Sequence, residues 1–450
     1  MHHYDELTDR MARAVFDYTH ERLRLEPVPI DHSVPRDELD SRAGNLLNAH
    51  GNDPEEVLRI FAEVLAPAVI SCDSPRFLAF IPAAPTKASL LFDMVVSSSS
   101  LLAISWLEGA GAVFAENQVL RFLADLAGLP DTAGGCFVAG GSAANLSALV
   151  VARETAKHRV AATASRWRIA VSDQTHSSVA NALRIMDVEP LVVPTDDERL
   201  TGATLQAALE ADGDPGSVCA VVATAGTTNA GIVDDLDGVG RVAAERGIWL
   251  HVDAAYGGAA LLAPTARHRF AGIENADSLV VDPHKWLYAP FDCAALIYRE
   301  PELARAVHTQ EASYLDVIHE RPTEWNPSDY AFHLTRRARG LPLWFSLAVH
   351  GSDAYRDAIE TALATAKAAA ARIAAIPHLE LVREPELSIV VFRRRGWSHA
   401  DYQRWSDDLL RAQVAFVTPS SWHGETVARL AFLHPDTTLE MVDEILAAMN

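Results

Sequence analysis

One lysine stands among apolar residues at the expected end of a strand. The segment VVDPHKWLYAP places Lys285 directly after His284, between buried-looking stretches. The chain contains only four lysines, Lys87, Lys157, Lys285 and Lys367, so arginine carries most of the positive charge. Arginine keeps its proton in proteins, whereas a lysine amine can lose it and act as a nucleophile. The composition therefore indicates that Lys285 is retained for its amine.

A carboxylate ends another apolar stretch, IWLHVDAAYGG. Asp253 closes the expected strand, and small residues follow it. A buried carboxylate needs a partner, because burying it unpaired is costly. A helix cap or an arginine would satisfy it. The small residues equally suit a flat ligand lying close to the backbone.

Three further turns place polar groups after strands. VAGGSAANLSAL puts Gly140, Gly141 and Ser142 between a strand and a helix. Open backbone N–H groups at a helix N-terminus favour an anion, although a plain tight turn explains the glycines as well. His176 follows the next strand, where a lone histidine is more often structural. Thr228, in VATAGTTNAG, by itself indicates an ordinary turn.

Taken together, these groups match the needs of one cofactor. Parallel strands gather their ligands at their carboxyl ends. Pyridoxal phosphate needs a lysine amine for a Schiff base, a carboxylate for its ring nitrogen, backbone donors for its phosphate and a flat partner for its ring. The sequence therefore predicts an enzyme that uses pyridoxal phosphate.

The elements that must position these residues are short strands alternating with Ala- and Leu-rich helices. This alternation predicts an α/β fold with a mostly parallel sheet flanked by helices. We expect a helical segment over 1–75, a large domain over 76–335 and a small C-terminal α/β domain over 336–450, with a long helix at 354–375. The seven strand candidates of the large domain are 136–141, 168–173, 190–195, 217–226, 248–255, 278–282 and 293–299.

Composition excludes several classes of function. A chain of 450 residues exceeds one ordinary core, and its net charge of −22 disfavours nucleic acids and anionic membranes as partners. The four cysteines show no metal-binding spacing, so no metal site is expected and a reducing compartment fits best. The N-terminus lacks the apolar core of a signal peptide, and the longest apolar stretch contains Asp93 and a run of serines. We expect a cytoplasmic protein.

Beyond these residues, the chain resembles the group II pyridoxal-phosphate-dependent decarboxylases, the family of aromatic-L-amino-acid, histidine, tyrosine and glutamate decarboxylases. The resemblance runs from SPRFLAFIPAAPTKASLLFDMV through HVDAAYGGAALL and VDPHKWLYAPFDCAALIY to RRARGLPLWFSLAVHG. It implies a fold type I enzyme and a homodimer, with the 1–75 segment packing in the dimer. It also implies that Lys285 forms the Schiff base beside His284, and that Asp253 pairs with the ring nitrogen. The remaining cofactor contacts that it implies are Ala255 and His176 on opposite ring faces, Thr228, and Ser142, Ala143 and Ala144 at the phosphate.

The chain departs from the family pattern at three places. Ala143 and Ala144 stand where hydroxyl residues often occur, which leaves mostly backbone donors for the phosphate. Asp282 precedes PHK where asparagine is often found, and its carboxylate would repel a phosphate unless it faces another donor. The family's loop tyrosine, which returns a proton to the substrate, falls here on Pro327 or Ser328 within the 315–330 loop. Tyr330 and His319 are the nearby candidates for that acid.

The expected reaction is the decarboxylation of an L-amino acid to the amine and carbon dioxide. Loss of the loop tyrosine leaves oxidative deamination to an aldehyde open as an alternative, and a non-catalytic binding protein is disfavoured by the intact Lys285 and Asp253. By resemblance, the side-chain pocket lacks a cation, so we expect an aromatic or apolar substrate, and Thr335 favours a phenol. An arginine such as Arg321 or Arg339 could still reach the pocket. The residues assigned to it are Phe80, Ile81, Pro82, Ala83, Leu102, Ile104 and Thr335.

Overall fold

The computed structural model describes residues 2–82, 84–159, 166–313, 315–319 and 324–450. The chain divides into two compact units, and each is described by itself. The first consists of Met1–Pro82, Ala368–Arg383 and Val391–Asn450. The second consists of Ala83–Lys367 and Glu384–Val390, and it contains all the strands predicted for the large domain.

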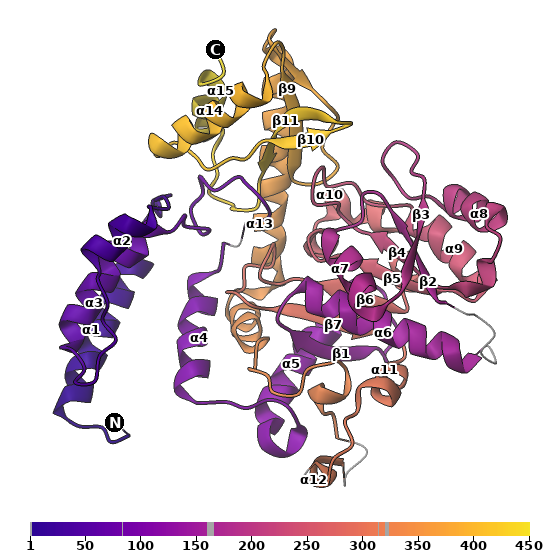
Figure 1. Ribbon diagram of the computed structural model, residues 1–450, viewed down its shortest axis with the longest axis horizontal. Helices are drawn as coiled ribbons and strands as arrows, with labels where there is room; N and C mark the ends of the chain where they lie inside the picture. The colour runs from indigo at the N-terminus through magenta and orange to yellow at the C-terminus, as the bar shows by residue number, and fades with distance from the viewer. Residues whose placement is uncertain (1, 83, 160–165, 314, 320–323) are drawn as a thin grey trace. The chain divides into compact units, whose positions relative to one another are not determined.

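The second unit is built on a seven-stranded sheet in the order β1-β7-β6-β5-β4-β2-β3 (Figure 1). Strand β7 runs antiparallel to both β1 and β6, and the remaining pairs are parallel. The predicted mostly parallel seven-stranded sheet is therefore confirmed. Its strands are β1 (Gly134–Val138), β2 (Arg168–Ser172), β3 (Glu189–Val193), β4 (Val218–Thr224), β5 (Trp249–Asp253), β6 (Ser278–Val281) and β7 (Ala294–Tyr298).

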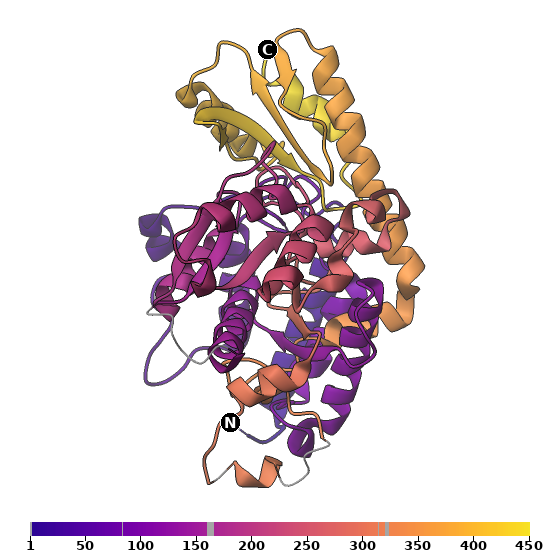
Figure 2. The same ribbon diagram turned by 90° about the vertical axis from the view of Figure 1, so that its right-hand side faces the viewer.

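Helices pack on this sheet and connect its strands (Figures 1 and 2). Helix α6 lies across β1, β4, β5, β6 and β7, while α9 packs on β4 and β5. Buried aliphatic residues of α6 and α7 form one core cluster with the strands. The helices of this unit are α4 (Lys87–Ser98), α5 (Trp106–Leu126), α6 (Gly141–Arg159), α7 (Ser177–Met186), α8 (Gly202–Ala211), α9 (Leu236–Arg246), α10 (Pro264–Arg267), α11 (Pro301–His308), α12 (Asp316–His319) and most of α13 (Leu341–Ala375).

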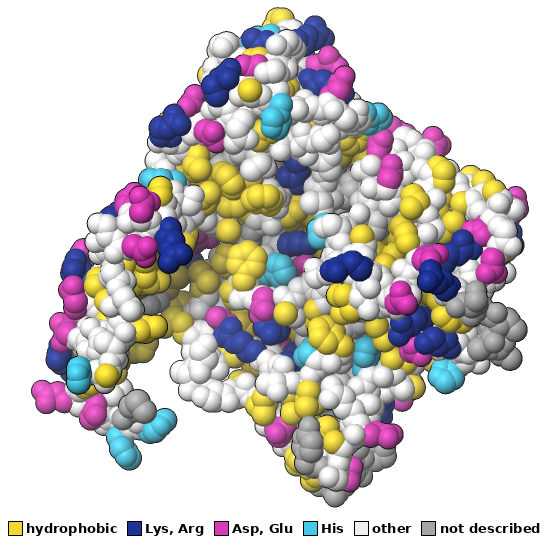
Figure 3. Space-filling model, viewed as in Figure 1, with side chains coloured by type: hydrophobic (Ala, Val, Ile, Leu, Met, Phe, Trp, Pro, Cys, Tyr) yellow, Lys and Arg dark blue, Asp and Glu magenta, His cyan; other side chains and the backbone are white. Residues whose placement is uncertain are grey.

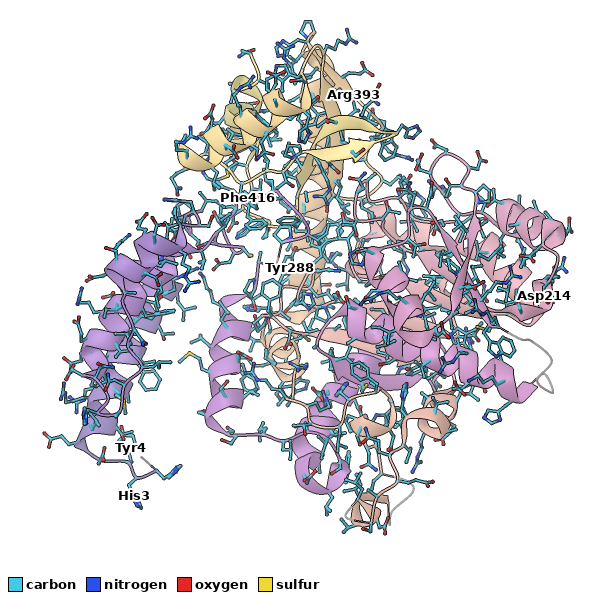
Figure 4. The ribbon with its side chains drawn as sticks, viewed as in Figure 1. His3, Tyr4, Asp214, Tyr288, Arg393 and Phe416 are labelled. Atoms are coloured by element: carbon cyan, nitrogen blue, oxygen red, sulfur yellow. The ribbon has the colours of Figure 1, made fainter. Side chains whose placement is uncertain are left out.

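Strand register brings the sites predicted from sequence to one edge. Thr224 at the end of β4 pairs with Asp253 at the end of β5, and Asp253 pairs with Val280 of β6. The segment after β6 is held by Tyr288, labelled in Figure 4, which is 3% exposed and whose carbonyl accepts from Thr86 N–H at 3.0 Å. The residues that follow these three strands are therefore fixed at the same end of the sheet.

The first unit combines N-terminal helices with a four-stranded sheet in the order β10-β11-β9-β8. Asp53 caps one of these helices, because its carboxylate accepts from the N–H groups of Glu55 and Glu56. Phe416, labelled in Figure 4, packs edge-on against Phe77 with ring centroids 5.0 Å apart. The elements are α1 (Glu6–Leu23), α2 (Arg36–Arg42), α3 (Pro54–Ile60), β8 (Leu379–Leu381), β9 (Ile389–Arg394), α14 (His399–Arg411), β10 (Ser420–Trp422), β11 (Glu425–Ala431) and α15 (Leu439–Ala447).

The long helix α13 begins earlier than predicted. It starts at Leu341, and a break at Gly351, where φ is +74°, precedes the expected Ala-rich stretch. A left-handed backbone is costly for any residue with a Cβ, so glycine permits the break. None of the helices that the model describes is long and apolar enough to cross a membrane.

Candidate functional site

One cavity of about 340 Å³ lies where strands β4, β5 and β6 end and helices α6 and α7 begin. Pockets of a few hundred Å³ commonly hold small ligands and cofactors. The cavity brings together Lys285, Asp253 and His176, which are far apart in the sequence. Its walls are formed by Ala139, Gly140, Gly141, Ser142, Asn145, His176, Ser178, Thr224, Gly226, Thr228, Asp253, Ala255, Tyr256, Asp282, His284, Lys285, Phe291 and Asp292.

Lys285 lies between acidic side chains. Its Nζ is 3.1 Å from Oδ2 of Asp282, and its side chain is 23% exposed. Burial lowers the pKa of the Lys285 amine, but the negative charges of Asp282 and Asp253 raise it more, so that the pKa lies above its usual value. The apolar sequence context therefore gives an incomplete picture, because the two carboxylates favour the charged amine in the cofactor-free protein.

Asp282 faces donors, as the sequence argument required. Its Oδ2 accepts from the backbone N–H of Gly141 at 3.2 Å, at the start of α6, and lies 3.7 Å from Nε2 of His284. Its Oδ1 is buried and has no hydrogen-bond partner within the described part of the chain. Burial lowers the pKa of His284, although Asp282 raises it in part. Asp282 thus places a negative charge in the cavity wall, beside the Lys285 amine.

Asp253 is 6% exposed and accepts hydrogen bonds at both oxygens. Oδ1 accepts from the Ala255 N–H at 3.1 Å, and Oδ2 accepts from Nδ2 of Asn145 at 2.8 Å. These donors satisfy the buried carboxylate without an arginine. The sequence analysis therefore found the carboxylate but did not identify its partner Asn145, which lies four residues after Gly141 on α6.

His251 is another residue that the sequence analysis did not single out. It is fully buried on β5, and its Nε2 lies 2.9 Å from Oδ1 of Asn145. A signal was present, because residues two apart in a strand share a face, so His251 and Asp253 face the same way. Burial lowers the pKa of His251 to about 4, with the charge of Asp253 acting in the opposite direction.

His176 forms the N-cap of α7. Its Nδ1 accepts from the Ser178 N–H at 3.2 Å and lies 2.9 Å from Ser178 Oγ. Its ring lines the cavity, as do Thr228, Ala255 and Ser142. These four residues are therefore at the surface of the predicted site.

The two alanines assigned to the phosphate do not line this cavity. The N–H groups of Ala143 and Ala144 both donate to the Gly140 carbonyl, at 3.0 and 3.1 Å, and Ala144 is fully buried. Gly141 stands at the wall instead. A Cβ on Gly141 would lie 3.0 Å from Asp282 Oδ2 and 3.4 Å from Cβ of Ala255, so only glycine leaves this part of the cavity open. Backbone contacts from Ala143 and Ala144 stay a prediction.

Tyr330 lies in the core rather than at the cavity wall. It is 2% exposed and stacks on Trp325 with ring centroids 4.3 Å apart. Burial raises the pKa of its phenol. Pro327 and Ser328 form a buried 3₁₀ turn. The side chain of His319 and the whole of Arg321 fall outside the described residues, so the identity of the loop acid stays a prediction.

None of the described residues assigned to the substrate side chain lines this cavity. Ile104 is 9% exposed and Thr335 is exposed, and neither lines the cavity. Phe80 and Pro82 belong to the first unit, where Phe80 is 60% exposed with its ring near Phe416. Ala83 falls outside the described residues. The substrate pocket therefore stays a prediction.

The donor set in the cavity fits pyridoxal phosphate. A helix N-terminus with an open glycine can face an anion, the buried Asp253 can face a cationic ring nitrogen, and Lys285 supplies an amine. Within the described residues, no group of three or more histidine, cysteine, aspartate or glutamate side chains is placed to hold a metal ion.

Comparisons with known proteins point the same way. The family model described as the pyridoxal-dependent decarboxylase conserved domain matches residues 41–395. The aromatic-L-amino-acid decarboxylase of Bacillus atrophaeus is 30% identical over 436 residues, covering 94% of this chain and 90% of that protein. The enzyme of the same name from Sus scrofa is 31% identical over 400 residues, covering 84% and 82%.

Solved structures share the whole fold. The crystal structure of Oryza sativa TDC with PLP and tryptamine aligns with a TM-score of 0.92 at 25% identity, covering 100% of this chain and 99% of that one. The structure of Rhodiola rosea 4-hydroxyphenylacetaldehyde synthase aligns with a TM-score of 0.87 at 24% identity, covering 98% and 96%. The second likeness concerns the fold alone.

Proposed function

The chain belongs to the pyridoxal-dependent decarboxylases, and on that basis we propose that it converts an aromatic or apolar L-amino acid to the amine and carbon dioxide. It is a carboxy-lyase that uses pyridoxal phosphate. The observation that carries the proposal is the single cavity that holds Lys285, Asp253 and His176 together. The relatives named as aromatic-L-amino-acid decarboxylases support the substrate class.

Seven residues that line the cavity have a role in this proposal. Lys285 binds the cofactor aldehyde, Asp253 pairs with its ring nitrogen, and His176 and Ala255 lie against its ring. Ser142 contacts its phosphate, Thr228 contacts the cofactor from its own turn, and His284 lies beside Lys285. Held by these residues, pyridoxal phosphate would supply an electron sink for the α-carbon of the substrate. Asp253 stabilises the positive ring nitrogen that makes this possible, since opposite charges favour each other in a buried site.

Covalent labelling of Lys285 tests the cofactor site. Borohydride reduction of the loaded enzyme followed by peptide mapping should place the cofactor on Lys285. The other three lysines serve as internal controls, because Lys157, for instance, is paired with Glu154 at 2.8 Å on the surface of α6. A label on Lys87, Lys157 or Lys367 in place of Lys285 would overturn the assignment.

A competition among amino acids tests the substrate class. Tyrosine, phenylalanine, tryptophan, leucine, glutamate and aspartate are compared by kcat/KM. Aromatic or apolar substrates should win, because an acidic side chain would lose hydration beside residues without a cation. A preference for glutamate or aspartate would defeat the proposal. A preference for tryptophan over tyrosine would remove only the inference from Thr335.

Tyr330 stays the proposed proton donor on its place in the sequence alone, since its side chain lies in the core and not at the cavity wall, and product analysis tests it. The Tyr330→Phe variant should lose most amine formation while still binding cofactor. Amine and aldehyde are measured together with dioxygen consumption, because the alternative reaction yields an aldehyde and consumes dioxygen. Aldehyde as the main product of the unaltered protein would establish the alternative. Full amine formation by the variant would exclude Tyr330 as the acid.

We further propose a homodimer in which the 1–75 segment packs against a second copy. Helix α1 has no buried residue and exposes Leu7, Met11 and Val15 along one stripe, and Figure 3 shows hydrophobic side chains among the charged ones on these helices. Such exposed apolar stripes mark interaction surfaces. Light scattering should show a dimer for the unaltered chain and a monomer for Leu7→Asp/Val15→Asp, whereas the control Asp17→Asn should remain dimeric. A monomeric unaltered chain would refute this.

Two further expectations stay proposals. The division into 1–75, 76–335 and 336–450 predicts that limited proteolysis cuts near residues 75 and 335, and cuts confined to other sites would contradict it. A cytoplasmic location is supported by the four cysteines, all of which are free thiols. Cell fractionation should recover the protein in the cytoplasmic fraction, and recovery in a secreted fraction would contradict the proposal.

A further inference from the structure

A chain of buried polar side chains lies behind Asp253. Asn145, His251 and Ser278 are each at most 1% exposed, and Trp249 is 4% exposed. They come from α6, β5 and β6. Buried polar groups without partners are costly, so the order of hydrogen bonds among them is under strong constraint.

The direction of the chain is set by groups that have one role, because the ionised Asp253 carboxylate can only accept and the indole N–H of Trp249 can only donate. Trp249 Nε1 lies 2.8 Å from Ser278 Oγ, and the Ser278 hydroxyl lies 2.7 Å from Nδ1 of His251. Because Asp253 accepts the amide N–H of Asn145, the Asn145 oxygen faces His251 and needs a proton on Nε2, so Nδ1 is the acceptor and Ser278 donates its proton to it. The remaining nitrogen of His251, Nε2, therefore carries the ring proton and donates to Asn145 Oδ1 at 2.9 Å. Burial lowers the pKa of His251 to about 4, which agrees with a neutral ring holding one proton.

This donation fixes the amide of Asn145. Because Oδ1 accepts from His251, the amide nitrogen must face the other way, where it donates to Asp253 Oδ2 at 2.8 Å and to Ser178 Oγ at 3.0 Å. A flipped amide would place Oδ1 against the Asp253 carboxylate and leave two acceptors facing each other. His251 thus supplies the matching donor that holds the amide in the orientation in which Asp253 receives an N–H.

The same order continues to His176. Ser178 Oγ accepts from Asn145, so its proton is available to Nδ1 of His176 at 2.9 Å. The backbone N–H of Ser178 also donates to that nitrogen, at 3.2 Å. His176 Nδ1 is therefore an acceptor, and the ring proton lies on Nε2. The indole N–H of Trp249 and the backbone N–H of Ser178 can only donate, and both fit this one order of hydrogen bonds.

We propose that Asn145, His251, Ser278 and Trp249 are positioning residues that orient an N–H donor onto Asp253 and, through Ser178, hold His176 with its proton on Nε2. This inference rests on the proposed contacts of Asp253 and His176 with the cofactor. The donor stabilises the negative carboxylate opposite the ring nitrogen, and the fixed tautomer gives the cofactor one defined ring partner. We call Asn145, His251, Ser278 and Trp249 the relay. None of these four side chains had been given a role from the sequence.

The test compares two substitutions of His251. In His251→Phe the ring shape is kept and the donor to Asn145 is lost, whereas His251→Gln keeps an amide N–H that can donate. The dissociation constant of pyridoxal phosphate and the visible absorption of the bound cofactor are measured for each. The Phe variant should bind about tenfold more weakly with an altered visible band, because the Asn145 amide that donates to the charged Asp253 carboxylate loses the donor that holds its oxygen in place. The Gln variant should recover most of both properties.

A second buried histidine provides the matched control. His308 is 7% exposed, and its Nε2 lies 3.1 Å from the Ser147 carbonyl, away from the cavity wall. His308→Phe should leave the cofactor affinity and spectrum unchanged. The relay would be overturned if His308→Phe lost as much cofactor affinity as His251→Phe, or if His251→Phe bound the cofactor as the unaltered protein does. It would also be overturned if His251→Gln bound the cofactor as weakly as His251→Phe.

Two further variants keep the test decisive. If His251→Phe does not fold, Ser278→Ala removes one buried hydroxyl and should weaken binding several-fold, and unchanged binding would overturn the relay. Asp253→Ala separates the relay from the site itself. If Asp253→Ala binds and absorbs like the unaltered protein, the proposed cofactor contact fails. If Asp253→Ala loses binding while His251→Phe does not, only the relay fails.

Discussion

Lys285 lies between the negative charges of two aspartates in the cofactor-free protein. Asp282 is in contact with its amine, and the charge of Asp253 adds to the effect. An amine must lose its proton before it attacks an aldehyde. The local charges therefore oppose the first encounter with the cofactor and favour the cationic state, so that the carboxylates control the pH at which Lys285 becomes reactive.

The variant Asp282→Asn should lower the pKa of Lys285 in the cofactor-free protein, because the closest negative charge is removed while burial remains. Competitive labelling with an amine-reactive reagent across a pH series measures this, with the modified peptide read by mass spectrometry. Asp292→Asn is the matched control, since Asp292 also lines the cavity but pairs with Arg339. An unchanged or raised pKa in Asp282→Asn would show that Asp282 does not set the charge of Lys285.

His251 makes stability depend on pH. Its pKa is lowered to about 4 in the folded chain, below the usual value near 6.5, so the unfolded chain binds a proton first as the pH falls. The contribution is fully present above pH 6.5 and is lost as the pH falls towards 4. Between pH 7 and pH 5 the free energy of unfolding should fall by roughly 2 kcal/mol less in His251→Gln than in the unaltered chain.

Urea unfolding of the cofactor-free protein at several pH values measures this difference. His50→Gln is the control, because His50 is exposed in the loop before α3 and should leave the pH dependence as it is. Parallel pH profiles for His251→Gln and the unaltered chain would contradict a buried neutral His251.

At the scale of elements, the start of α6 is placed by a close approach to the segment after β6. Gly141 donates to Asp282, and a Cβ there would lie 3.0 Å from the Asp282 carboxylate. The same position is part of the cavity wall. Because Gly141 has no side chain, the start of α6 can approach Asp282 closely and the neighbouring part of the cavity stays open.

Gly141→Ala should weaken cofactor binding about tenfold, because a methyl group enters the cavity and pushes on Asp282. Fluorescence titration of the cofactor-free protein gives the dissociation constant, and thermal melting reports folding. Gly111→Ala on α5 is the control, since no atom lies within 4 Å of its added Cβ, and it should be neutral or slightly stabilising. Unchanged affinity in Gly141→Ala would remove this glycine from the binding surface.

The elements themselves could be predicted, and the side-chain partnerships could not. Each predicted strand of the large domain is present, because buried parallel strands are short apolar runs bounded by turns. Asp253 and Lys285 were found because an ionisable residue in such a run is conspicuous. Asn145 was missed because asparagine near a helix start is common. Only the packing of α6 on β5 in the folded chain brings it into contact with Asp253. Tyr330 was proposed from proximity in sequence, which does not report that it stacks on Trp325.

At the scale of the whole molecule, a buried ion pair joins distant parts of the second unit. Arg336 lies 2.8 Å from Glu116 of α5, and the two side chains are 0% and 2% exposed. Glu116 also accepts from the Gly340 N–H at 2.9 Å. Breaking a buried pair leaves one charge without compensation, which commonly costs several kcal/mol.

Arg336→Met should lower the free energy of unfolding by about 3–5 kcal/mol, because the Glu116 carboxylate remains buried alone. The double variant Arg336→Met/Glu116→Gln should be more stable than Arg336→Met, since the amide is neutral and keeps an oxygen for Gly340. Urea unfolding measures both. Arg13→Met is the control for an exposed pair, with side chains 78% and 42% exposed, and should change stability by less than about 0.5 kcal/mol. A double variant less stable than the single one would contradict the argument.

Because β5 is paired with strands on both sides, a change in its register should abolish cofactor binding in a molecule completely and not weaken it by degrees. Asp253 is aligned with Thr224 on one side and Val280 on the other, and His251 shares its face. A slip of one residue in β5 would turn both side chains to the opposite face of the sheet together. A single-residue insertion in this strand should thus divide the molecules into two populations, one with full cofactor occupancy and one with none. A uniform population with weakened binding is not expected.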